Sequence, residues 1–118
     1  MIIDTHVHFY DPTRPEGIPW PPKDNELLYR PILPQNFVER TEKMGVAGTV
    51  VVEASKIVED NQWILDLAAD NPCIVGFVGS LDPKTEDFEK NLDRFSANPL
   101  YRGIRLGLQR GSLEDHEA

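Results

Sequence analysis

Four short apolar runs, separated by longer amphipathic segments, constrain the fold of this chain more than any other feature of its sequence. The runs are rich in β-branched residues, which favours strands, and they cover residues 2–9, 49–52, 73–78 and 101–107. Helices are expected between them over residues 34–44, 60–71 and 85–97, where apolar residues recur at helical spacing. This alternation predicts an α/β fold whose parallel strands are joined by right-handed helical crossovers.

Each expected helix has one apolar face that should pack against the sheet. Pro34 suits the first position of the first helix, and Gly45 suits the residue beyond its end. The residues expected to face inward are Phe37, Val38, Thr41 and Met44, then Trp63, Ile64, Leu67 and Ala68, and finally Phe88, Leu92 and Phe95.

Two histidines stand near the end of the first expected strand. Because side chains alternate along a strand, Asp4, His6 and His8 should share one face. Neutral imidazole is a ligand for zinc, iron or manganese, so the pair predicts a metal site. The alternative is a pair of surface or satisfied core histidines. The position favours the site, because α/β proteins place sites where strands run into loops.

A long loop follows this strand, over residues 9–33, and loops of this length are usually functional or disordered. Trp20 and Tyr29 lie within it and either cover a site or anchor the loop to the core. Regular structure is not expected there, because the segment contains Pro12, Pro15, Pro19, Pro21, Pro22 and Pro31.

Composition narrows the possible partners and location. The net charge of -8 argues against a nucleic acid or an anionic membrane as partner. No apolar run approaches the length of a membrane span. No nucleotide-binding glycine motif follows the first strand. The single cysteine, Cys73, and the absence of a leader-like start lead us to expect a cytoplasmic protein. The length of 118 residues suits one domain.

The motif Asp4-Thr5-His6-Val7-His8-Phe9 resembles the first-strand signature of the amidohydrolase superfamily, and more narrowly its amidohydrolase-related lactonases. Residues 48–54, 74–78 and 101–105 resemble the next three strands of that family. The resemblance runs to about Leu108 and implies a (β/α)₈ barrel. A full barrel typically needs about 250 residues. Residues 1–118 would therefore form a single partial domain, the first half of a barrel, with four strands, three helices and a polar tail at 109–118.

The resemblance also implies a divalent metal, with zinc the first expectation and manganese the second, although some relatives are metal-free. His6 and His8 would be two of its ligands. The catalytic aspartate and the remaining ligands belong to later strands in such proteins, so no catalytic residue is assigned. Leu106 occupies a position where some relatives carry a histidine, and His116 is expected to be a surface residue.

Two charged residues, Glu53 and Arg105, lie within or beside apolar strands. A charge in such a place is costly unless it is paired. Arg105 could bind an anionic group of a substrate, and Glu53 could orient a histidine or a substrate hydroxyl. The alternative is an ion pair between the two, which would be structural.

We therefore expect, for the complete barrel, a metal-dependent hydrolase that opens a lactone or related cyclic ester of a sugar acid or dicarboxylate. Three alternatives stay open: a non-oxidative decarboxylase, a metal-dependent deoxyribonuclease, and a non-catalytic fragment or assembly module. The substrate should be a small, anionic molecule. Either a second copy or the other half of the barrel should be needed, because the inward residues Val50, Val52, Ile74 and Ile104 would otherwise lack packing partners.

Overall fold

The computed structural model describes residues 1–106, so the expected polar tail and His116 lie outside the described residues. All strands form one parallel sheet in the order β1-β2-β3-β4. The predicted α/β alternation is confirmed. The elements are β1 (Ile2–Val7), α1 (Pro34–Thr41), the short 3₁₀ helix η1 (Glu42–Met44), β2 (Val46–Val52), α2 (Val58–Asp70), β3 (Ile74–Gly79), α3 (Phe88–Ser96) and β4 (Tyr101–Ile104).

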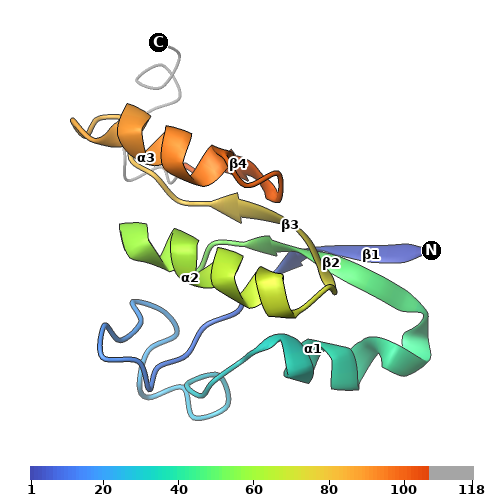
Figure 1. Ribbon diagram of the computed structural model, residues 1–118. Helices are drawn as coiled ribbons and strands as arrows, with labels where there is room; N and C mark the ends of the chain where they lie inside the picture. The colour runs from blue at the N-terminus through green and yellow to red at the C-terminus, as the bar shows by residue number, and fades with distance from the viewer. Residues whose placement is uncertain (107–118) are drawn as a thin grey trace.

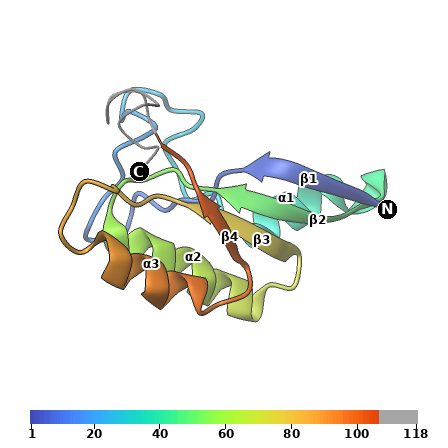
Figure 2. The same cartoon turned by 90° about the horizontal axis from the view of Figure 1, so that it is seen from above.

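The core lies between the sheet and its helices. Figures 1 and 2 show α2 and α3 side by side on the same face of the sheet. Val51 and Phe77 of the sheet and Phe95 of α3 are fully buried. Burying a side chain of this kind typically contributes about 1.5–3 kcal/mol. This layer therefore holds α2 and α3 against the sheet. None of the helices within residues 1–106 combines the length and the apolar character that a bilayer crossing requires.

The first helix differs from its prediction. α1 ends at Thr41, and η1 continues the helical segment to Met44. Gly45 follows and takes the left-handed conformation expected of a residue beyond a helix end. Phe37 is buried, whereas Val38 and Met44 are exposed, so the prediction that these two face inward is wrong. The change from α to 3₁₀ geometry after Thr41 alters the angular spacing of side chains, so residue 44 leaves the buried face. Val38 lies within α1, on the side of the helix turned away from the buried Phe37.

The sheet also departs from strict alternation. Between β2 and β3, Thr49 pairs with Ile74 but Val50 pairs with Gly76, so Val75 is an extra residue and is exposed. This irregularity changes which face of the sheet the neighbouring side chains point to. Ile74 therefore belongs to the core that the helices cover.

The expectation that Ile74 and Val52 lack packing partners is therefore wrong, because both are buried. Several boundaries differ as well: β1 ends at Val7, β2 begins at Val46 and α3 begins at Phe88. β4 ends at Ile104 instead of residue 107, so Arg105 follows the strand, and α2 begins at Val58 and also buries Leu65.

A buried hydrogen-bond network centred on Asn61 joins α2 to the ends of two strands. The Asn61 side chain accepts hydrogen bonds from the Ser80 backbone N–H (3.0 Å) and from the Tyr101 hydroxyl (3.2 Å). Its amide donates to the carbonyls of Val58 and Ser80, each at 2.9 Å. Because every polar atom of this buried amide is satisfied, the network sets how α2 sits on the sheet.

We expect this network to make stability fall at high pH. Burial raises the pKa of Tyr101 from 10.0 to about 12. The unfolded chain therefore releases this proton first, so the contribution of Tyr101 is complete below about pH 10 and is lost towards pH 12, by roughly 1.4 kcal/mol per pH unit. Urea unfolding of the Tyr101→Phe variant should show a smaller decline between pH 10 and 12 than the wild type. An identical decline in both proteins would contradict this role of Tyr101.

Candidate functional site

The carboxyl ends of the parallel strands meet at one edge of the sheet, where the arrowheads in Figure 2 point in one direction. His8 follows β1, Glu53 follows β2 and Arg105 follows β4. Glu53 and Arg105 extend the ladder by one step, because their backbone N–H groups donate to the carbonyls of Val78 and Gly79, each at 2.8 Å. The backbone therefore places the candidate residues at this edge.

His6 and His8 lie next to each other, as their spacing predicts. Their ring centroids are 5.0 Å apart and the rings are nearly perpendicular. His6 is exposed and His8 is half-buried. The carboxylate of Asp4, on the same strand, accepts a hydrogen bond from the His6 backbone N–H at 3.0 Å. The two imidazoles are thus within reach of one small ligand.

The end of β2 fixes the orientation of the His8 ring. Its Nδ1 lies 2.9 Å from the carbonyl oxygen of Val52. A carbonyl can only accept, so Nδ1 carries the proton and the neutral ring presents the lone pair of Nε2. This is the arrangement that most metal-ligating histidines share.

The pair fits a metal ion only in part. Within residues 1–106 there is no group of three or more His, Cys, Asp or Glu side chains that could hold a metal ion. Zinc sites in proteins use three or four protein ligands. The described residues therefore offer two nitrogen ligands, and a complete site needs further ligands from elsewhere.

Glu53 and Arg105 form the ion pair that the sequence left open as an alternative. Arg105 Nε donates to Glu53 Oε1 at 2.9 Å. The Arg105 side chain is 46% exposed, so the pair is not a buried one. Both residues line a cavity of about 540 Å³ together with Lys56 and Trp20. His8 lines a different cavity, of about 390 Å³. Arg105 thus lies in the space adjoining the one beside His8.

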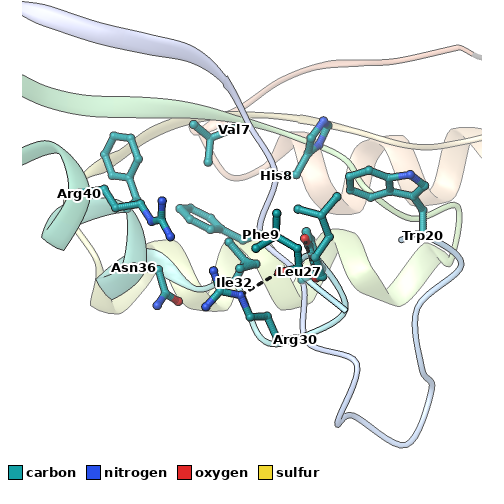
Figure 3. Close-up of a pocket in the computed structure, with 12 residues that line it drawn as sticks. Val7, His8, Phe9, Trp20, Leu27, Arg30, Ile32, Asn36 and Arg40 are labelled. Atoms are coloured by element: carbon teal, nitrogen blue, oxygen red, sulfur yellow. Dashed lines mark hydrogen bonds between the residues drawn. The ribbon is translucent and has the colours of Figure 1, made fainter. Parts of the chain in front are cut away.

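Trp20 stands between these two cavities and lines both. Its ring centroid is 6.0 Å from that of His8 and 5.8 Å from that of Tyr10. Figure 3 shows the indole beside His8, across from the apolar residues of the loop. Trp20 therefore covers the site, one of the two roles open to it, whereas the half-buried Tyr29 lines neither cavity.

The loop that carries Trp20 is tied down at both ends and in the middle. Tyr10 and Ile32 exchange backbone hydrogen bonds of 3.0 and 2.9 Å. Arg14 pairs with Asp60 at the start of α2 (2.9 Å) and stacks over the ring of Trp63 at 4.3 Å. No local pattern signals a contact between residues 46 positions apart, so Arg14 and Asp60 were not identified from the sequence.

The parallel β/α units place the chain in the class of (β/α)-barrel proteins, of which it forms the N-terminal part. A family model described as Amidohydrolase matches residues 3–118. The chain therefore belongs to the amidohydrolase family.

Three proteins illustrate the similarity. An L-fucono-1,5-lactonase from Burkholderia ambifaria is 34% identical over 107 residues, which cover 91% of this chain and 37% of that protein. The crystal structure of a Burkholderia multivorans amidohydrolase with bound zinc superposes with a TM-score of 0.79 at 24% identity, over 95% of this chain and 39% of the other.

A probable 2-pyrone-4,6-dicarboxylic acid hydrolase from Acinetobacter baumannii, with citric acid bound, gives a TM-score of 0.63 at 20% identity, over 89% of this chain and 37% of the other. The two structural likenesses support the fold. This chain spans less than two fifths of the length of each of these relatives.

Proposed function

We propose that these residues form the metal-binding and substrate-binding part of a hydrolase that opens the ring of a sugar lactone. The observation that carries the proposal is the His6–His8 pair, with the His8 ring held by the Val52 carbonyl so that Nε2 faces outward as a ligand. The similarity to an L-fucono-1,5-lactonase supports the choice of a lactone.

In this proposal His6 and His8 bind a divalent ion, with zinc the first candidate and manganese the second. The zinc in a structural relative supports that order. When bound, such an ion would polarise the lactone carbonyl and lower the pKa of the attacking water. The Val52 carbonyl keeps His8 in the ligating tautomer. The catalytic carboxylate and the remaining metal ligands are expected outside the described residues.

This function is tested by measuring hydrolysis of L-fucono-1,5-lactone by the full-length protein. A lactone gives a carboxylic acid, so base uptake at constant pH measures turnover, and a chelator should abolish it until zinc is restored. Carbon dioxide release from an aromatic acid would favour the decarboxylase alternative instead, and cleavage of DNA would favour the deoxyribonuclease. A protein inactive in all three assays would support the non-catalytic alternative.

Arg105, oriented by Glu53, is proposed to bind a carboxylate of the substrate or of the product. Its Nε is occupied by Glu53, but the side chain is 46% exposed and a guanidinium carries further donors. We expect Arg105→Met to raise KM about tenfold for a lactone that carries a carboxylate and much less for a neutral one.

Water screens the half-exposed Arg105, but the Glu53 side chain is 13% exposed and would lose its partner, so the same substitution should lower the free energy of unfolding by about 1–2 kcal/mol. A large loss of stability with unchanged KM would instead assign the Glu53–Arg105 pair a purely structural role.

The partners proposed are a small-molecule substrate and either further β/α units or a second copy of the chain. β1 and β4 form the two edges of the sheet in residues 1–106, and unpaired edges invite pairing. Sedimentation of the 118-residue chain should show self-association, and a cooperatively folded monomer would contradict this. A cytoplasmic location, with Cys73 reduced, is part of the same proposal.

A further inference from the structure

We propose that Trp20 is the platform on which the sugar ring of the substrate stacks, and that it thereby selects saturated, hydroxylated lactones. This inference rests on the proposed function and deepens it. The starting observation is that a large apolar side chain stays 45% exposed at the edge of the sheet that carries the histidines. The indole also contacts His8 and lines both cavities at this edge, so a small ligand in either cavity would touch it.

The position of Trp20 suits a ligand that reaches both the histidines and the Glu53–Arg105 pair. Trp20 lines the cavity of about 390 Å³ beside His8 and also the cavity of about 540 Å³ beside Arg105. Cavities of about 300–1,000 Å³ accommodate small organic ligands. A ring resting on the indole would therefore have the His8 imidazole on one side and the Arg105 guanidinium on the other.

The indole is held in place instead of moving freely with its loop. Edge-to-face contacts with His8 and Tyr10 fix its plane, at interplanar angles of 60° and 77°. The Tyr10 hydroxyl donates to the carbonyl of Leu28 at 3.0 Å, which ties the neighbouring ring to the same loop. Arg14 links the loop to α2. A surface that is already ordered loses little conformational entropy when a ligand binds.

The chemistry of the platform indicates the ligand class. The face of an aromatic ring carries partial negative charge. The C–H bonds on one face of a saturated sugar ring carry partial positive charge, so the two surfaces attract each other while the hydroxyl groups remain free for polar contacts. Indole offers the largest such face among the side chains. The occupant is therefore a pyranose-sized ring with one C–H-rich face.

Kinetics of Trp20 variants test the inference. Trp20→Leu should raise KM for L-fucono-1,5-lactone at least about tenfold and change kcat by less than about threefold, since a stacking contact binds substrate and transition state alike. Trp20→Phe keeps an aromatic face, so its KM should lie between that of the wild type and that of Trp20→Leu. Trp63→Phe, which keeps a ring beneath Arg14, is the matched control and should match the wild type. A KM unchanged in both Trp20 variants, with His8→Ala inactive, would overturn this inference but leave the proposed function intact.

A fluorescence titration tests binding at Trp20 independently of catalysis. The 118-residue chain has two tryptophans, so in its Trp63→Phe variant the emission comes from Trp20 alone. L-fucose, whose pyranose ring cannot be hydrolysed as a lactone, should change that emission saturably. The Trp20→Phe variant, with only Trp63 emitting, should show no change. Absence of a response in the Trp63→Phe variant would overturn the stacking role, whether or not the protein hydrolyses lactones.

Discussion

Replacing His8 with alanine should lower the affinity for zinc by more than about 100-fold and abolish lactone hydrolysis. Removing only a residue that hydrogen-bonds to a metal ligand already lowers metal affinity or activity about 10–100-fold, and His8 would be a ligand itself. His8 is one of two imidazoles offered by the described residues, and its Nε2 is oriented by the bond from Nδ1 to Val52. Competition with a chromophoric zinc chelator would measure the affinity, and base uptake at constant pH would measure turnover.

The matched control is His116→Ala, which removes the third histidine of the chain. It should leave zinc affinity and turnover within about twofold of the wild type, because no motif around His116 in the sequence indicates a ligand. If instead His8→Ala binds zinc as tightly as the wild type, the assignment of the pair as metal ligands is wrong.

Gly79→Ala should destabilise the chain by about 3 kcal/mol or more, because it combines overpacking with damage to a buried hydrogen-bond network. A Cβ on Gly79 would lie 2.5 Å from both Cε2 and the hydroxyl oxygen of Tyr101 and would collide with the Asn61 side-chain oxygen. Neither side chain can move away cheaply, since both are buried and hydrogen-bonded to each other. Urea unfolding followed by circular dichroism would measure the loss.

Gly103→Ala provides the control for this substitution. Gly103 lies in β4, between Arg102 and Ile104, and a Cβ built there meets nothing within 4 Å. Its free energy of unfolding should stay within about 1 kcal/mol of the wild type, the range typical of a tolerated glycine-to-alanine change. Equal effects at the two glycines would show that the Asn61 network does not limit packing at Gly79.

The order of the elements and the histidine pair could be predicted because both depend on local patterns. Unbroken apolar runs such as residues 49–52 have few alternatives to a buried strand. The period of two along a strand predicts that His6 and His8 lie together, and they do so although β1 ends at Val7 and its pairing with β2 is irregular between Asp4 and Val7. Pro34 and Gly45 marked the start and the end of the first helical segment for equally local reasons.

Most contacts around the site could not be predicted, because they join residues far apart in the chain. Arg14 meets Asp60 through tertiary structure alone. The ion pair between Glu53 and Arg105 was one of two alternatives that the sequence left open, and only the tertiary structure decides between them. The exposure of Val75 depends on a register shift between two strands. Asn61, which has an ordinary polar side chain in the sequence, satisfies all its hydrogen bonds only once α2, β3 and β4 have come together.

The central claim is that His6 and His8 bind one divalent ion at the carboxyl end of β1. X-ray absorption at the zinc edge, on the zinc-loaded protein as the cell makes it, tests this most directly. The wild type should show imidazole nitrogens at about 2.0–2.1 Å, and the His6→Ala, His8→Ala double variant should lose two of them or the metal altogether. The same imidazole signal in both proteins would contradict the claim.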